Sequence, residues 1–261
     1  MQGKSITIIK SIAKQLLFYI ALLGLWQGLC SLNDYFEWRK SYSIPSPVGV
    51  WESLMRLIEQ NALFPAIAAS LQKVFIGYLI SILIGIIFGL MISKSKYLSE
   101  TLKPLILGVQ TLPSICWVPF SVIWFGINDA AVLFVIIMGS AFSVAIAVDN
   151  AIRNVNPLYI KSAKTMGANS RELYLKVILP ASLPSLLSGL KQGWSFAWRS
   201  LMAAEVMAVS VGIGQILLMR RDLADINGLM LIMIIIIIVG VFIEKFVFTI
   251  PEKRLTKKLG Y

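Results

Sequence analysis

Long apolar stretches alternate with short charged loops along the whole chain. Each of these stretches approaches the roughly 20 apolar residues that a helix needs to cross a bilayer. We therefore predict an all-α, polytopic membrane protein that forms one transmembrane domain over residues 1–261, with six transmembrane helices. The predicted spans are Leu16–Leu32, Ala66–Ile92, Pro104–Phe125, Ala130–Val148, Leu183–Val209 and Gly228–Ile250.

The composition agrees with a membrane protein and argues against a soluble one. Hydrophobic residues make up 57% of the chain and charged residues only 14%, whereas about a quarter of a soluble domain is charged. The formal net charge of +11 comes from loops and tails rather than from one basic stripe with interleaved aromatic residues. We therefore expect the lipid bilayer to surround this chain, and we expect the chain to bind no nucleic acid.

Loop charges predict how the chain is oriented. Positive charge is in excess before the first span, in the loops at 93–103 and 149–182, and in the tail from 252. The loop after the first span and the short loops at 127–129 and 220–225 have no such excess. Because Lys and Arg collect on the cytoplasmic side, both termini are predicted to be cytoplasmic.

The sequence lacks histidine and the common motifs for metal and nucleotide binding. The chain has no His, its cysteines Cys30 and Cys116 form no CxxC pair, and it has no Walker motif for ATP. We therefore expect no catalytic residue, no metal site and no cofactor in this chain.

The longest polar interruption of the C-terminal half predicts a helix, a glycine turn and a second helix. Asn156 is a suitable N-cap for a helix from Pro157 to Met166, and Gly167 is placed to end it in a left-handed conformation. Ser170 is then expected to cap a second helix, which Pro180 ends.

The first of these helices presents a small apolar and hydroxylated face. Tyr159, Ala163 and Met166 share it at i, i+4 and i+7 spacing. Such a face suits a groove on a partner protein, and an amphipathic helix lying on the membrane surface explains the spacing equally well.

Proline and ionisable residues mark a candidate path through the membrane. Pro113 and Pro119 are expected to bend or break the third span, and broken helices often line cavities. In the fifth span, Lys191, Arg199 and Glu205 should each face a cavity or a partner, because a charge in hydrocarbon is costly. Trp117 and Trp198 accompany them as candidates, although an interfacial anchor or a structural tie remains an alternative for these residues.

The interruption resembles the coupling loop of permease subunits in binding-protein-dependent ABC importers. That motif reads approximately EAA, three residues, Gly, nine residues, then I-x-L-P. Here Lys161-Ser162-Ala163 takes the first place, Gly167 the glycine, and Val177-Ile178-Leu179-Pro180 the end, and Ala168 opens the nine-residue gap. Lys161 and Ser162 depart from the pattern, which leaves an acidic contact to the ATPase in question.

The resemblance implies a type I importer permease fold. It also implies a homodimer, a cytosolic ATPase dimer that binds ATP and receives the coupling helix, and an extracytoplasmic solute-binding protein. The segments PSPVGVW, LPSICWVPFSVIWFG, GLKQGWSFAWRSLMAAE and GIGQ are most similar to the nitrate, sulfonate and taurine branch.

Membership of that branch implies that the substrate is a small anion, which Arg199 would favour. A thiamine-precursor pyrimidine carried by the same class of importer is the alternative. A stand-alone secondary transporter is disfavoured, because the sequence has neither inverted repeats nor paired intramembrane carboxylates.

Overall fold

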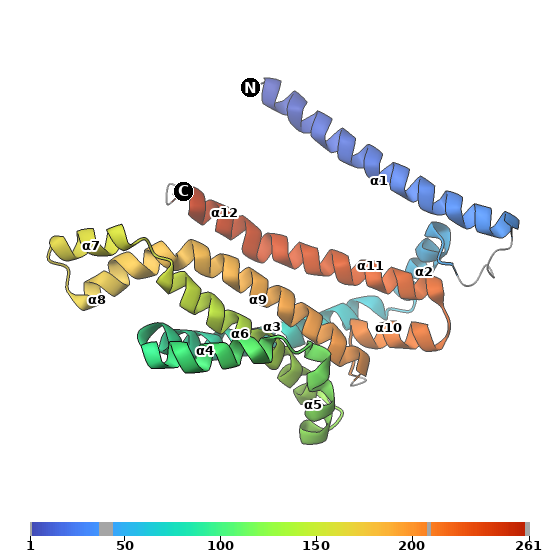
Figure 1. The fold of residues 1–261 in the computed structure, drawn as a ribbon. Coiled ribbons are helices and arrows are strands. Elements are labelled where there is room, and N and C mark those ends of the chain that lie inside the picture. The colour runs from blue at the N-terminus through green and yellow to red at the C-terminus, as the bar shows by residue number, and fades with distance from the viewer. Residues whose placement is uncertain (1, 37–43, 208–209, 259–261) are drawn as a thin grey trace. The chain divides into compact units, whose positions relative to one another are not determined.

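The computed structural model describes residues 2–36, 44–207 and 210–258, and these residues form helices and connecting turns without a strand. Figure 1 shows the order of the helices along the chain. They are α1 (Gln2–Phe36), α2 (Pro47–Glu59), α3 (Leu63–Lys94), α4 (Lys96–Gln110), α5 (Val118–Phe125), α6 (Asp129–Arg153), α7 (Pro157–Thr165), α8 (Ser170–Glu172), α9 (Leu179–Met207), α10 (Ile213–Asp222), α11 (Ile226–Ile243) and α12 (Ile250–Lys258). A 3₁₀ turn, Ser114–Trp117, precedes α5, and π-helical turns at Leu173–Ile178 and Glu244–Thr249 precede α9 and α12.

The long helices confirm most of the predicted spans. Within the described residues, four helices are long and apolar enough to cross a membrane: Leu63–Lys94, Asp129–Arg153, Ser170–Met207 and Ile226–Lys257. The bent pair Lys96–Gln110 and Ser114–Phe125 makes a fifth if it is one span. The first predicted span corresponds to a shorter apolar helix, Leu17–Asn33. Val209 and the side chains of Lys4, Lys10 and Leu16 lie outside the described part of the chain.

The chain divides into two compact units. One comprises Met1–Phe64 and Ile216–Ile235, and the other comprises Pro65–Gln215 and Ile236–Tyr261. All candidate site residues named above belong to the second unit. That the chain forms a single domain over residues 1–261 stays a prediction.

In the first unit, α2 is fixed at its start by two sets of hydrogen bonds. The Ser46 side chain accepts a hydrogen bond from the Gly49 amide, which caps α2, and the Ser46 amide donates to Asn227 Oδ1 at 2.9 Å. The Trp26 indole donates to the Pro45 carbonyl at 2.9 Å. The two prolines around Ser46 therefore lead into a short helix, as their sequence indicates.

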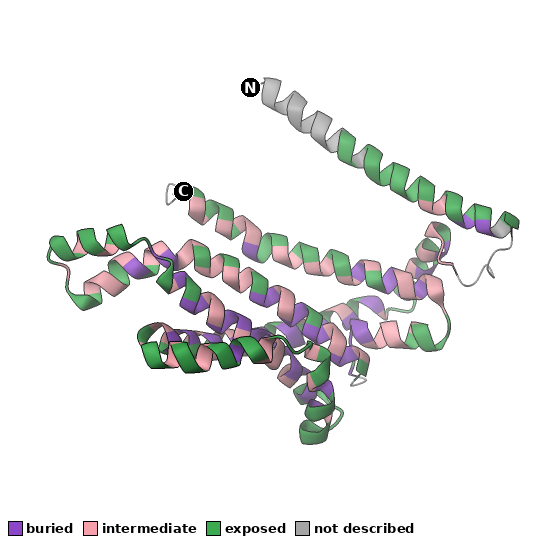
Figure 2. Ribbon diagram, viewed as in Figure 1, coloured by how far each residue is buried: buried purple, intermediate pink, exposed green. Residues whose placement is uncertain are grey.

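In the second unit, α6 and α9 form the core. They pack along their lengths, and Figure 2 shows many of their residues as buried. Gly85 and Gly89 of α3 allow a close approach to α6, because a Cβ at these positions would collide with Val144 and Val148. The small-xxx-small pair Gly85 and Gly89 thus serves helix packing.

The third predicted span is broken at Pro113. Helix α4 ends at Gln110, Pro113 precedes the 3₁₀ turn, and the two helical segments differ in direction by 95°. Proline disfavours a helical conformation at the residue before it, which explains the break. Pro119 was expected to bend the span as well, and this prediction is wrong. It lies in the first turn of α5, where a missing N–H leaves no helical hydrogen bond unmade.

Candidate functional site

Helix α7 is capped at both ends by the residues that its sequence indicates. Asn156 Oδ1 accepts a hydrogen bond from the Leu158 amide at 2.9 Å, and Pro157 occupies the first turn. At the other end Gly167 has a φ of +82°. The amides of Gly167 and Ala168 donate to the carbonyls of Lys164 and Ala163, each at 3.0 Å. This double closure makes α7 a stiff, well-defined helix that ends at Thr165, one residue before the predicted end.

Helix α7 carries exposed apolar side chains. None of its residues is buried, and Met166, just beyond its end, is 87% exposed. Tyr159 is also exposed, Ala163 is half-buried, and Lys161 is exposed. The predicted apolar face is therefore accessible for a partner.

The second helix, α8, begins one residue earlier than predicted. Its cap is Asn169 rather than Ser170, and Asn169 Oδ1 accepts from the Glu172 amide at 2.9 Å. Glu172 in turn accepts from the Asn169 amide at 3.3 Å. Both Asn and Ser are good N-caps, and the position of Glu172 selects Asn169 because a capping box needs an acidic residue three positions later.

Pro180 does not end this helix, so that prediction is also wrong. The π-helical turn Leu173–Ile178 runs directly into α9, with the Leu179 amide donating to the Tyr174 carbonyl. A wider turn places the proline ring away from the carbonyl that it would otherwise strike. Residues 170–207 are thus helical without interruption, and they connect the loop after α7 directly to the core helix α9.

A buried carboxylate near the end of α6 connects three helices, α3, α4 and α6. Asp149 is fully buried and lies 2.7 Å from Lys103 Nζ of α4 and 2.6 Å from Arg153 Nε of α6. Arg153 also donates to the Ile92 carbonyl near the end of α3 at 2.9 Å. This cluster was not predicted from the sequence. The i, i+4 spacing of Asp149 and Arg153 indicated their ion pair, but nothing local indicated the contact with Lys103.

A second buried carboxylate, Glu205, joins α3, α9 and the start of α10. Its Oε1 lies 2.7 Å from Lys73 Nζ, and Ser70 Oγ lies 2.8 Å from each of its oxygens. The Gly214 amide donates to Oε2 at 2.9 Å. Glu205 lines none of the pockets described below, and its ionisation is compensated inside the protein.

Lys73 also supports the turn between α9 and α10. Its ammonium donates to Ser210 Oγ at 2.6 Å and to the Val211 carbonyl at 2.5 Å. Lys73 was not singled out from the sequence, yet a lone cation within a long apolar stretch is itself a signal for a buried partner.

Of the other two charged residues of the fifth span, Lys191 has an ion-pair partner and Arg199 has none among the described residues. Lys191 lies 3.3 Å from Glu244, with both side chains about one-third exposed. Arg199 makes no ion pair with any described residue. Its Nε donates to the Ser195 carbonyl at 3.0 Å, and its guanidinium carbon lies 4.7 Å from the centre of the Phe196 ring.

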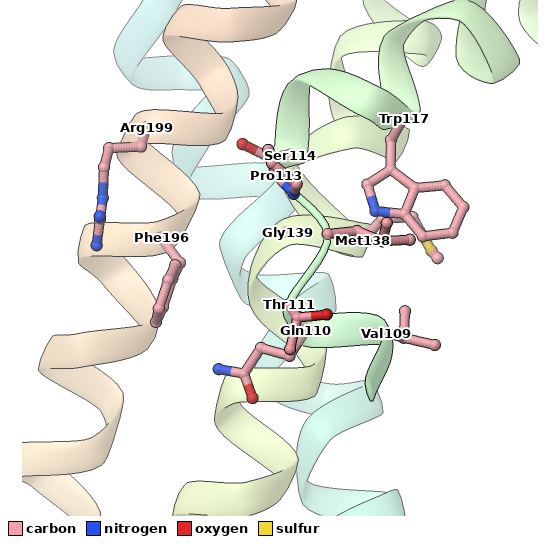
Figure 3. A pocket seen from close by; sticks show the side chains of 11 residues that line it. Val109, Gln110, Thr111, Pro113, Ser114, Trp117, Met138, Gly139, Phe196 and Arg199 are labelled. Carbon is pink, nitrogen blue, oxygen red and sulfur yellow. The ribbon is translucent and has the colours of Figure 1, made fainter. Parts of the chain in front are cut away.

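Arg199 borders a pocket of about 310 Å³ at the break in the third span. Figure 3 shows Phe196 and Arg199 on one side, and the chain from Gln110 to Ser114 on the other. The lining residues are Val109, Gln110, Thr111, Leu112, Pro113, Ser114, Trp117, Met138, Gly139, Phe196 and Arg199. Three of the predicted path residues, Pro113, Trp117 and Arg199, therefore lie together.

Trp198 lies apart from this pocket. It is buried, stacks on Trp194 with ring centres 6.3 Å apart, and lines a different hollow with Gly240 and Glu244. Arg199 borders that hollow as well. The structure thus separates the five predicted path residues into the pocket group, Trp198 in an aromatic cluster and Glu205 in an ion-pair network.

A second pocket of about 430 Å³ shares Gln110 with the first. Its lining is uncharged and rich in hydroxyl and amide groups: Leu107, Gln110, Ser143, Ile146, Ala147, Asn150, Asn154, Ser185, Ser188, Gly189 and Gln192. Residues of α6 and α9 line both pockets: Gly139 and Arg199 border the first, and Asn154 at the end of α6 borders the second.

Comparison with known proteins identifies the family. Residues 81–257 match the model for the binding-protein-dependent transport system inner membrane component. A putative aliphatic sulfonates transport permease protein from Bacillus subtilis (strain 168) is 27% identical over 248 residues, which cover 95% of this chain and 88% of the relative. A nitrate import permease protein from Leptolyngbya laminosa is 31% identical over 217 residues, covering 80% and 75%.

A solved structure shows the same fold. The MetNI methionine ABC transporter in an inward-facing conformation aligns with a TM-score of 0.65 at 20% identity, covering 76% of this chain and 98% of the aligned MetNI chain. The expected type I importer permease fold and the expected similarity to the nitrate and sulfonate branch are both confirmed. This chain belongs to the family of inner membrane components of binding-protein-dependent ABC importers, and is a multi-pass permease of the cytoplasmic membrane.

Proposed function

We propose that this chain is the permease subunit of an importer that moves a small oxyanion, such as a sulfonate, taurine or nitrate, into the cytoplasm. ATP is hydrolysed on a separate subunit. The observation that carries the proposal is that relatives named for sulfonate and nitrate transport align along most of this chain. The uncompensated cation Arg199 beside a pocket supports the same substrate class.

The partners follow from the family and from α7. We propose that two copies of the chain form a homodimer, and that each α7 docks in a groove of a cytosolic ATPase dimer. The contact surface is the exposed face with Tyr159, Ala163 and Met166. Lys161, in place of the usual acidic residue, gives this contact a positive charge that the ATPase groove must match.

The geometry around α7 provides two routes by which an ATPase movement reaches the membrane helices. The first is the uninterrupted helix from Ser170 to Met207, which transmits displacement along α9. The second is the Asp149 cluster, which links α6 to α3 and α4. Elements linked in this way move as rigid bodies, which is what alternating access requires.

A pyrimidine importer is the less supported alternative. A neutral or cationic substrate gains nothing from an unpaired guanidinium, and the relatives described above are named for anions. A stand-alone transporter is disfavoured because both buried carboxylates, Asp149 and Glu205, already have cationic partners inside the protein.

Purification through a tag on this chain, followed by mass spectrometry, tests the proposal. We expect an ATPase subunit to be recovered with the chain, and a co-encoded binding protein to bind taurine, methanesulfonate or nitrate. A binding protein that takes only a pyrimidine would replace the proposed substrate class. Recovery of the chain alone, under conditions that keep a known importer intact, would remove the proposal itself.

A further inference from the structure

We infer that the pocket between α9 and the break in the third span is an oxyanion-binding site within this chain, with Arg199 as its anchoring cation. This inference rests on the proposed function and adds to it. It places substrate recognition in the permease as well as in the external binding protein.

Among the charged residues of α9, only Arg199 has no ion pair with a described residue. Lys73 is paired with Glu205, and Lys191 with Glu244. Arg199 has no carboxylate within ion-pair distance in the described part of the chain, although it lies well inside α9. A cation in an apolar span is costly unless a counter-charge or water reaches it. A passing anion supplies that counter-charge.

The guanidinium of Arg199 keeps free donor groups at the edge of the pocket. One of its donors, Nε, is used by the Ser195 carbonyl, and the Phe196 ring lies against the guanidinium. Both contacts hold the group in place and leave the two terminal Nη groups without a described acceptor. Two parallel N–H donors match two oxygens of a sulfonate or nitrate, so Arg suits this position better than Lys.

Neutral donors lie on the opposite wall of the pocket. The Ser114 hydroxyl and the Gln110 amide line it, and neither side chain has a hydrogen-bond partner among the described residues. A polar group in a pocket without a partner is available to a ligand or to water. Arg199 therefore meets an anion from one side, and these two groups meet it from the other.

The apolar part of the lining limits what can be attached to the anion. Trp117, Met138 and Phe196 provide a surface for a short carbon chain. A volume of about 310 Å³ lies at the lower end of the range of small-molecule sites, which is about 300–1,000 Å³. This space accommodates a sulfonate with a two- or three-carbon tail, and it accommodates nitrate with several waters.

The second pocket explains how the anion leaves. It shares Gln110 with the first, and it is lined by Ser143, Asn150, Asn154, Ser188 and Gln192 without a charged residue. Such neutral groups solvate an anion but do not trap it. The second pocket reaches Asn150 and Asn154 at the end of α6, which leads to α7, so release takes place at the end that the ATPase moves.

The test uses the complete transporter, reconstituted with its ATPase, in four forms: wild type, Arg199→Gln, Arg199→Lys and the control Lys96→Gln. The control removes one positive charge from a side chain that is 91% exposed. Binding of radiolabelled methanesulfonate is measured without the binding protein. Uptake and ATP hydrolysis are then measured with it.

We expect Arg199→Gln to weaken methanesulfonate binding about 10- to 100-fold, the loss typical of a charge-assisted hydrogen-bonded contact. Arg199→Lys should lie between Arg199→Gln and the wild type, and Lys96→Gln should match the wild type. Uptake should fall with binding, whereas ATP hydrolysis stimulated by the loaded binding protein should persist. Dimethyl sulfone, a neutral molecule of similar shape, should not compete.

Binding and uptake by Arg199→Gln at wild-type levels would overturn the inference, and so would competition by dimethyl sulfone. If Arg199→Gln fails to assemble, Ser114→Ala provides the test, with binding expected to weaken about threefold to tenfold. Unchanged binding by Ser114→Ala would then overturn it. A wild-type complex that moves no anion would instead contradict the proposed function, so the two failures are distinguishable.

Discussion

Lys73 Nζ lies 2.7 Å from Glu205 Oε1, and the two side chains are only 7% and 0% exposed. The pair connects α3 to α9 and is completed by Ser70, Ser210 and the Gly214 amide. A buried ion pair contributes little relative to a well-packed apolar pair, but the loss of one partner leaves an uncompensated buried charge. The pair is therefore a structural tie between α3 and α9.

Glu205→Gln should lower the free energy of unfolding by about 3 kcal/mol, because the buried Lys73 then keeps only the mostly exposed Asp129, 3.8 Å away, as a counter-ion. Thermal unfolding in detergent measures this loss. Glu244→Gln is the matched control, since it breaks the partly exposed pair with Lys191 and should cost about 1 kcal/mol or less. Equal losses from both variants would contradict the structural role of the Lys73–Glu205 pair.

Asp149→Asn tests the second buried carboxylate, at the other end of α6. Asp129 at the start of α6 lies 3.8 Å from Lys73 Nζ, and Asp149 lies about 30 Å further along α6, at about 1.5 Å per residue. Lys103 and Arg153 are 26% and 41% exposed and can still reach water, so the stability loss should be only about 1–3 kcal/mol.

The main effect of Asp149→Asn should be on coupling, because Lys103 of α4 loses its ion pair with α6, and Arg153, which reaches α3, loses the carboxylate that holds it. We expect fewer substrate molecules imported per ATP hydrolysed, measured by uptake and phosphate release on the same proteoliposomes. Glu100→Gln, in the exposed pair with Lys96, should leave the ratio unchanged. A normal ratio in Asp149→Asn would show that the cluster is not needed for transmission.

The turn after α7 depends on the backbone of Gly167. Its φ of +82° strains any residue with a Cβ, although space is open around it. Gly167→Val should weaken ATPase recovery by disturbing the turn, whereas Gly167→Asn should be milder because Asn tolerates a left-handed conformation. Co-purification of the ATPase measures both. Equal recovery with Val and Asn would mean that the turn does not position α7.

Met166 tests the docking surface itself. At 87% exposure its replacement should not affect folding. Met166→Glu is expected to reduce ATPase recovery about tenfold by placing a charge in an apolar contact. Lys164→Glu, which changes a neighbouring exposed cation, separates a general charge effect from the loss of the apolar contact. If only Lys164→Glu reduces recovery, the contact is electrostatic rather than apolar.

The features that sequence predicted well are those with local causes. The apolar length of the spans indicated the long helices, and Asn156, Pro157 and Gly167 set the ends of α7 through cap chemistry. The break at Pro113 likewise follows from the residue itself.

The features that sequence missed depend on tertiary contacts. Lys73 and Glu205 lie far apart in the chain, so nothing local pairs them. A proline usually ends a helix, and only the π-helical turn before Pro180 allows this helix to continue. Trp198 and Arg199 are neighbours in sequence, yet one lies in an aromatic cluster and the other borders the pocket at the Pro113 break, which only the packing of α9 decides.

ATP-driven uptake by the reconstituted complex tests the central claim most directly. Proteoliposomes containing this chain and its ATPase are supplied with the loaded binding protein and radiolabelled taurine, methanesulfonate or nitrate. Accumulation of at least one of these anions is expected with ATP, and none when the partner ATPase carries a disabled Walker lysine. Accumulation that continues with the disabled ATPase, or uptake of a pyrimidine but of no anion, would contradict the assignment of this chain as an oxyanion importer permease.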